Sequence, residues 1–200
     1  INPNLANAHF NLGGILKSLG KLKEAEKSTQ RAIELNPNNE NYHYNLGAIL
    51  SDLGRLDEAK KSWRKAISLK SNFEEAIFEL AQRLYLEGDY KSVIKYVSNL
   101  TSERFQSLCL GGLLAIDDEE KFNQLYKKIS KNNIYNSEIG GIIEHANIIY
   151  KKKYDSLFCN NAFDYVFIEK INESLFSNEN LNHLISYLKN DNTQMRSQNT

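Results

Sequence analysis

The side chains in this sequence that are best placed for chemistry are amides and aromatic rings that recur at a fixed spacing. Asn11 and Asn45 share one register, and each follows an aromatic residue, Phe10 and Tyr44. A carboxamide both donates and accepts hydrogen bonds, so it can pair with the N–H and C=O groups of a peptide backbone. Aromatic rings bury a large area at little entropic cost. The spacing therefore favours the binding of an extended chain.

Residues that usually carry catalysis or hold metals are scattered. None of the histidines begins a His-x-Asp pair, and the cysteines have no metal or redox spacing; these residues are His9, His43, His145, His183, Cys109 and Cys159. We expect the cysteines to be small buried residues in a reducing compartment. The pairs Gly13-Gly14, Gly111-Gly112 and Gly140-Gly141 lie in apolar helical patterns, which favours close helix packing over phosphate binding. We therefore expect no catalytic residue, no metal and no cofactor.

Composition narrows the classes of partner. Lys and Arg together number 25, as do Asp and Glu, so the formal net charge is zero. This argues against nucleic-acid binding, which depends on an excess of positive charge. No apolar run approaches the roughly 18 residues that cross a membrane, and no signal peptide is visible. We expect a cytoplasmic protein, and because the chain begins at Ile1 and its single Met is Met195, we expect a fragment of a longer one.

The elements that must position these side chains are paired helices. Apolar residues recur at helical spacing over 6–18 and again over 22–35. Gly20 can adopt the left-handed conformation that ends the first helix, and Asn36-Pro37 ends the second. Leu12-Gly13 recurs as Leu46-Gly47 and more weakly as Leu80-Ala81, while Gly54 and Gly88 repeat Gly20. Small residues at Gly13, Ala25 and Ala32 let the two helices approach closely.

This pattern resembles the tetratricopeptide repeat, a 34-residue helix pair with a spaced Trp, Leu-Gly, Tyr, Ala, Phe and Pro signature. The Leu-Gly, Ala and Pro positions are kept, and Trp63 takes the late aromatic position. The third repeat departs from the signature at Ile77, Val93 and Leu100. The resemblance covers residues 3–100, with pairs near 6–35, 40–69 and 74–99. It implies an all-α fold, a right-handed α–α superhelix.

The rest of the chain lacks the signature. Within 101–155 we expect helices over 104–116, 118–131 and 136–151, with a turn at Asp117-Asp118, and these helices continue or cap the solenoid. Within 156–200 we expect a strand over 163–171, a helix over 179–189 and a disordered polar end. The strand and helix resemble the opening of a prolyl-hydroxylase-like 2-oxoglutarate and Fe(II) dioxygenase domain. The alternative is that they only cap the solenoid.

The resemblance also implies a site. In the tetratricopeptide family the first helices line a concave groove, and the matching residues here are Asn7, Phe10, Asn11, Asn41, Tyr44, Asn45, Glu75, Phe78, Glu79 and Gln82. Asn11 and Asn45 resemble the asparagine ladder in the repeats of O-linked N-acetylglucosamine transferase. In this chain Glu79 interrupts the ladder at the third repeat. Two alternatives stay open: the rings pack as core between first helices, and the asparagines are merely solvent-facing. Glu75 and Glu79 disfavour a clamp for a terminal carboxylate and favour a basic or neutral segment.

These observations lead to three hypotheses on function. The first is a scaffold that binds a protein or an extended peptide in the groove. The second is the substrate-docking region of a larger 2-oxoglutarate/Fe(II)-dependent oxygenase whose catalytic part lies beyond residue 200. The third is self-association through the exposed end of an uncapped solenoid. No nucleic-acid or membrane partner is expected.

Overall fold

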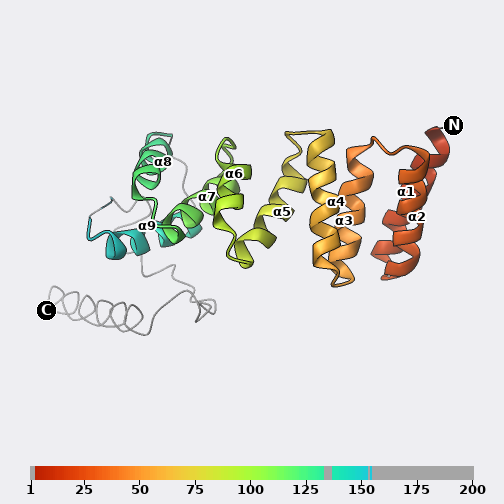
Figure 1. Cartoon of the computed structure of the whole chain (residues 1–200), viewed down its shortest axis with the longest axis horizontal. Helices are drawn as coiled ribbons and strands as arrows, with labels where there is room; N and C mark the ends of the chain where they lie inside the picture. Colours follow the sequence, from red (N-terminus) through yellow and green to blue (C-terminus); the bar gives the residue numbers. More distant parts are fainter. Residues whose placement is uncertain (1–2, 133–136, 153, 155–200) are drawn as a thin grey trace, which may run out of the picture. The chain divides into compact units, whose positions relative to one another are not determined.

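The computed structural model describes residues 3–132, 137–152 and 154, and within them every helix or strand assigned is an α-helix. Two compact units divide the chain, Ile1–Asn123 and Gln124–Thr200. The helices of the first unit follow one another in chain order from the N-terminus (Figure 1). Their bounds are α1 (Pro3–Ser18), α2 (Leu22–Leu35), α3 (Glu40–Asp52), α4 (Leu56–Leu69), α5 (Glu74–Leu86), α6 (Tyr90–Val97) and α7 (Glu103–Ala115).

Tight turns join the helices within each pair. Gly20, Gly54 and Gly88 have φ values of 74°, 76° and 78°, which confirms the left-handed ends expected for the first helices. The turn between α7 and α8 (Glu119–Lys131) uses Asp117 in the same conformation, with φ 57°. The same kind of turn therefore follows α1, α3, α5 and α7.

Small residues bring the two helices of a pair into close contact, as expected. A Cβ on Gly13 would collide with Thr29 Oγ1 of α2, and a Cβ on Gly47 would collide with the Trp63 indole of α4. Ala25 and Ala32 are fully buried. Gly111 is also a close-packing position, because a Cβ there would meet the Tyr85 hydroxyl. The expectation is wrong for Gly14 and Gly141 as far as the described residues go, since none of their atoms lies within 4 Å of a Cβ built at either position.

Successive pairs share a continuous apolar core. At the boundary between the first and second helix pairs, Ala6, Ala32 and Tyr42 form a buried cluster, with Phe10, Ile33 and Leu35 packed against it. Ion pairs lie along the same boundaries: Arg55 Nη1 lies 2.7 Å from Glu26 Oε1, and Lys60 Nζ lies 2.7 Å from Glu87 Oε1. Each pair thus buries the face that it cannot bury alone.

The second unit contains the end of α8 and helix α9 (Ser137–Ile149). Ile139, Ile143 and Ala146 form the buried side of α9. The Asn147 side chain holds the backbone of Tyr154, because Oδ1 accepts from its N–H at 2.6 Å and Nδ2 donates to its carbonyl at 3.3 Å. The Tyr126 and Tyr154 rings meet edge to face at 4.9 Å.

The expected helices are confirmed over the described part of the chain, with small shifts at their ends. The expected strand over 163–171 and helix over 179–189 lie outside the described residues. The dioxygenase resemblance rests on that segment, so it stays a prediction, as does the division at residues 100 and 155. None of the described helices is both long enough and apolar enough to cross a membrane.

Candidate functional site

The ten residues predicted to bind a ligand lie on α1, α3 and α5, the first helices of three successive pairs. We call this set the first-helix face: Asn7, Phe10, Asn11, Asn41, Tyr44, Asn45, Glu75, Phe78, Glu79 and Gln82. None of the ten is fully buried. The amides Asn7, Asn11, Asn41 and Gln82 are exposed, as is Glu75, whereas the three rings, Asn45 and Glu79 are half-buried. All ten can therefore be reached from solvent.

The rings of this face join neighbouring pairs. The Phe10 and Tyr42 centroids are 5.0 Å apart, and the Tyr44 and Phe73 centroids are 5.3 Å apart. Phe78 meets Phe105 of α7 edge to face at 5.9 Å. One of the two alternatives to ligand binding was that the rings pack between repeats. One side of each ring does pack in this way. The other side stays partly open, so a single ring can both hold two repeats together and contact a ligand.

The asparagines differ in how far the fold already uses them. Within the described part of the chain, the side chain of Asn11 makes no hydrogen bond. Asn45 Nδ2 donates to Thr29 Oγ1 of α2 at 3.3 Å, and Asn7 Oδ1 accepts from the Tyr42 hydroxyl at 2.5 Å. Asn45 keeps its carbonyl oxygen and one amide hydrogen for other partners. Asn11 is thus the freer of the two amides that share a register.

Charge is concentrated where α5 approaches Tyr44. The pKa of the Tyr44 hydroxyl is raised by burial first and then by Glu79 and Glu75, while Arg104 lowers it. Both carboxylates are therefore close enough to act on a side chain of α3. Two carboxylates and one guanidinium therefore act together on this end of the face.

Sequence reasoning missed Arg104, which extends the same register onto α7. Arg104 stands at the same distance along the chain before Asp117 as Glu75 does before Gly88. Its guanidinium lies 4.9 Å from the Phe78 centroid and 4.8 Å from the Phe105 centroid. Its Nη2 also lies 3.2 Å from Glu74 Oε2. Counting back from the left-handed turn that follows each first helix identifies Arg104. Counting forward by the regular 34-residue period does not.

Polar contacts also join the first helices near their C-terminal ends. Lys17 Nζ of α1 lies 3.5 Å from Asp52 Oδ2 of α3. Arg83 Nη2 of α5 donates to Ser51 Oγ of α3 at 3.4 Å. These contacts fix the spacing of the three helices at the end opposite to Asn7, Asn41 and Glu75.

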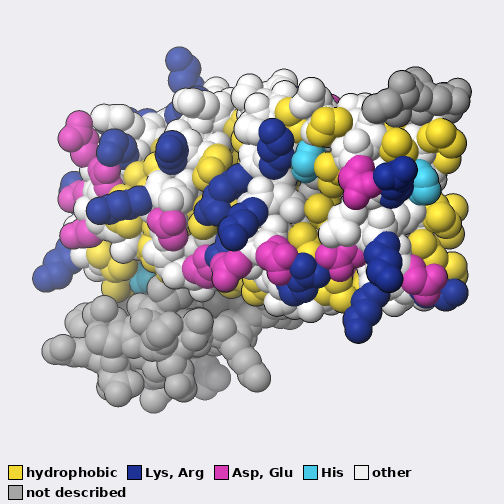
Figure 2. Space-filling model, turned by 45° about the vertical axis from the view of Figure 1, so that its right-hand side comes forward, with side chains coloured by type: hydrophobic (Ala, Val, Ile, Leu, Met, Phe, Trp, Pro, Cys, Tyr) yellow, Lys and Arg dark blue, Asp and Glu magenta, His cyan; other side chains and the backbone are white. Residues whose placement is uncertain are grey.

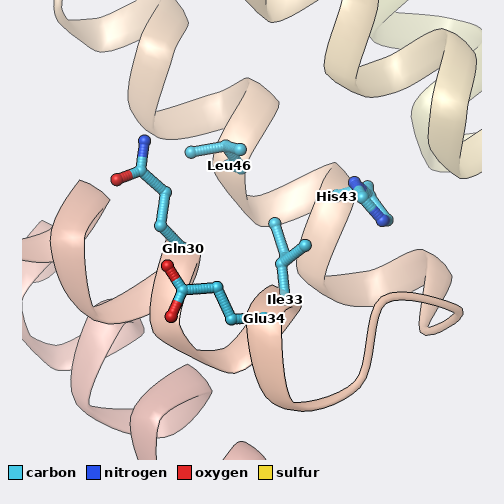
Figure 3. A pocket seen from close by; sticks show the side chains of 5 residues that line it. All are labelled: Gln30, Ile33, Glu34, His43 and Leu46. Atoms are coloured by element: carbon cyan, nitrogen blue, oxygen red, sulfur yellow. The ribbon is translucent and has the colours of Figure 1, made fainter.

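A shallow open hollow of about 270 Å³ lies between α2 and α3. Figure 3 shows the five side chains that line it: Gln30, Ile33 and Glu34 from α2, and His43 and Leu46 from α3. All three polar side chains already have partners. Gln30 Nε2 donates to Glu26 Oε1 at 3.2 Å, Glu34 pairs with Arg31 at 2.6 Å, and His43 Nε2 lies 2.8 Å from the Pro37 carbonyl. No residue of the first-helix face lines the hollow, so it is separate from the candidate site.

Reactive groups are few in the part of the chain that the structure describes. No cluster of three or more His, Cys, Asp or Glu side chains there is placed to hold a metal ion. Cys109 is buried, as expected, and burial raises the pKa of its thiol to about 11. The thiolate that reacts as a nucleophile is therefore disfavoured.

Comparison with known protein families gives matches over the first two helix pairs. A family model described as "Tetratricopeptide repeat" matches residues 6–39, and a second with the same description matches residues 29–61. No curated protein matches the sequence.

Three solved structures illustrate the likeness in fold. A structure from the functional characterization of Pseudomonas aeruginosa pilF has a TM-score of 0.52 and 19% identity, over 74% of this chain and 67% of that one. The MamA RS-1 ArsTM double mutant has a TM-score of 0.61 and 17% identity, over 74% and 85%. YrrB, described as a TPR protein with an unusual peptide-binding site, has a TM-score of 0.60 and 15% identity, over 75% and 79%. At these identities the likeness concerns the arrangement of the helices.

Proposed function

We propose that this tetratricopeptide-repeat protein is an interaction scaffold that binds an extended segment of a partner protein along its first-helix face. The observation that carries the proposal is a recurring arrangement on three helices. On each of α1, α3 and α5, a half-buried ring stands directly before a polar side chain: Phe10-Asn11, Tyr44-Asn45 and Phe78-Glu79. A segment that crosses the three helices meets an apolar surface and a hydrogen-bonding group at every step.

The polar groups suit the backbone of the ligand. Asn11 offers both a donor and an acceptor, and Asn45 keeps an acceptor and one donor beyond its bond to Thr29. Contacts with backbone N–H and C=O groups hold a chain in an extended form without selecting its sequence. Selection then depends on the side chains that meet the rings and the charges.

The charges favour a neutral or basic ligand segment at α5. Glu75 and Glu79 lie on this helix, and both act on Tyr44 of the neighbouring first helix. Complementary charge raises the rate of encounter and excludes wrong partners more than it adds affinity. The peptide-binding site described for YrrB, a protein of similar fold, supports a peptide as the class of ligand.

A displayed library of random peptides, selected on this chain, supplies ligands for the test. Their affinities are then measured by fluorescence anisotropy for the wild type and for two single variants. Asn11→Ala removes an amide of the face that the fold itself does not use. Gln30→Ala removes an exposed amide from α2, outside the face, and serves as the matched control.

Asn11→Ala is expected to weaken binding by about 1–3 kcal/mol, because backbone groups of the ligand lose their partner on being buried. Gln30→Ala is expected to leave the affinity unchanged. Equal losses in both variants, or a loss in Gln30→Ala alone, would place the ligand elsewhere on the molecule. Thermal unfolding of each variant confirms that the measured change is one of binding.

A further inference from the structure

The second helices of the first three pairs, α2, α4 and α6, each carry two lysines that stand four residues apart. We call this set the lysine ladder: Lys23 and Lys27 on α2, Lys61 and Lys65 on α4, and Lys91 and Lys95 on α6. All of them are exposed. Lys27, Lys61 and Lys95 occupy the same place in successive repeats. Figure 2 shows a face of the molecule on which Lys and Arg side chains project into solvent at many points.

The two lysines on each of these helices repel one another. Side chains four positions apart on a helix are neighbours, and like charges at that spacing destabilise the helix. In the described part of the chain, none of the ladder lysines forms an ion pair. Three successive second helices thus keep an unfavourable arrangement of charge that their own neighbours do not neutralise.

The carboxylates on these helices are already engaged elsewhere. All of them except Glu24 pair with a cation outside the ladder: Glu26 and Glu58 with Arg55, Glu34 with Arg31, and Asp57 with Lys60. The pKa of Asp57 is lowered first by its hydrogen bond to Lys60 and only then by Lys61. Helix α6 contains no acidic residue. The described residues therefore leave the positive charge of the ladder available to a ligand.

We propose that the lysine ladder binds an extended acidic segment of a second protein, with one carboxylate seated between the two lysines of each helix. A carboxylate at that place relieves the repulsion between both lysines. Neighbouring second helices are separated by one to two interaxial distances, roughly 8–20 Å, which an extended chain spans in about 3–6 residues. The partner segment therefore carries acidic residues at intervals of that length.

This surface differs from the first-helix face in both position and charge. The ladder lies on the second helices, whereas Glu75 and Glu79 lie on a first helix and form no ion pair within the described residues. The two surfaces therefore select ligand segments of opposite charge.

The arrangement favours a protein segment over a nucleic acid or an anionic membrane. Both of those present negative charge continuously, so they would also face the exposed carboxylates Glu24, Glu34 and Glu58. A peptide can place neutral residues at those points. The formal net charge of zero also lacks the positive excess on which nucleic-acid binding depends.

Fluorescence anisotropy with a labelled peptide tests the proposal. The probe has glutamate at every third position, separated by glycine and serine, and the control probe has glutamine in place of each glutamate. The wild-type chain is expected to bind the glutamate probe at low salt and not the glutamine probe. Lys27→Gln with Lys61→Gln and Lys95→Gln takes one lysine from each helix and is expected to weaken binding by about tenfold.

The matched control removes the same amount of charge from lysines that already have a carboxylate partner. Lys17, Lys70 and Lys121 pair with Asp52, Glu40 and Asp118. Replacing these three lysines by glutamine should change the affinity by less than about twofold, because their charge is already neutralised. Asn11→Ala, on the first-helix face, should bind the glutamate probe as the wild type does.

Thermal unfolding adds a measurement without ligand. The ladder variant should be at least as stable as the wild type, because the substitutions relieve repulsion within each helix. A less stable ladder variant would mean that these lysines serve the fold, and would overturn the proposal. So would a wild-type chain that does not bind the glutamate probe, an equal loss of affinity in the ladder and control variants, or a loss in Asn11→Ala. Tighter binding of a single-stranded DNA of the same charge as the probe would also overturn it, since the ladder would then select phosphate over carboxylate.

Discussion

The Trp63 indole fills the space in which a side chain on Gly47 would stand, so α3 and α4 touch through a residue without a Cβ. Trp63 is fully buried, and its ring cannot move without opening the core between the two helices. The Leu-Gly position of the repeat is thus explained here by a contact with a named side chain.

The first prediction compares two glycines of first helices. Gly47→Ala should lower the free energy of unfolding by about 1–3 kcal/mol, because the new methyl group overpacks the contact with Trp63. Gly14→Ala should raise it by roughly 0.5–1 kcal/mol, because alanine favours a helix and no atom of the described residues lies within 4 Å of the added one. Urea unfolding of both variants measures the two changes. Changes of the same sign would contradict the close packing at Gly47.

The second prediction concerns the turns. Asp117 has φ 57° at a place where three earlier turns use glycine. Asp117→Gly should stabilise the chain by up to about 1 kcal/mol, because glycine adopts this conformation without steric cost. Gly54→Ala should destabilise it by a similar amount, since the backbone there has φ 76°. Thermal unfolding checks both variants, and a stabilising Gly54→Ala would refute the argument.

The third prediction separates two contacts of Arg104. Glu74→Gln removes only an ion pair between side chains that are more than 40% exposed, and should cost no more than about 0.5 kcal/mol. Arg104→Ala also removes the guanidinium from the Phe78 and Phe105 rings and should cost roughly 1–2 kcal/mol. Arg104→Lys should fall between them, because lysine keeps the charge without the planar stack. Equal losses in Glu74→Gln and Arg104→Ala would show that the rings contribute nothing.

The fourth prediction follows from Tyr44. Its pKa is raised in the folded chain, so the folded state favours the neutral phenol while the unfolded state begins to ionise near the ordinary value of 10.0. The unfolded state therefore binds fewer protons above that pH, and stability falls as the pH rises. Tyr44→Phe should remove part of this fall, measured as the difference in urea unfolding between pH 9 and pH 11. Glu75→Gln with Glu79→Gln should reduce it as well, and no change in either variant would contradict the cause given.

The sequence predicts the helix pairs well because their signals are local. Glycines at left-handed turns and small residues at close contacts mark each pair, and the structure confirms both at Gly20 and Gly13. The regular spacing between successive left-handed turns ends after the third pair, because Asp117 follows Gly88 sooner than Gly88 follows Gly54. Arg104 was missed for that reason.

The hydrogen bonds that individual side chains make could not be predicted in the same way. Asn45 donates to Thr29, and Asn7 accepts from Tyr42. These bonds depend on how one helix packs on another, which spacing alone does not determine. Positions 7 and 41 share a register, but only Asn7 faces a tyrosine on the next first helix.

The ring contacts between neighbouring pairs have a mechanical consequence. A row of ring contacts along the first unit joins neighbouring pairs: Phe10 with Tyr42, Tyr44 with Phe73, and Phe78 with Phe105. If a ligand binds along the first-helix face as proposed, a change in the spacing of the pairs would change the distance between Asn11 and Glu79, and so the length of segment that fits between them. In that proposed binding mode, a bound segment that covers the rings would resist such bending, and tension on the chain would then change the lifetime of the complex.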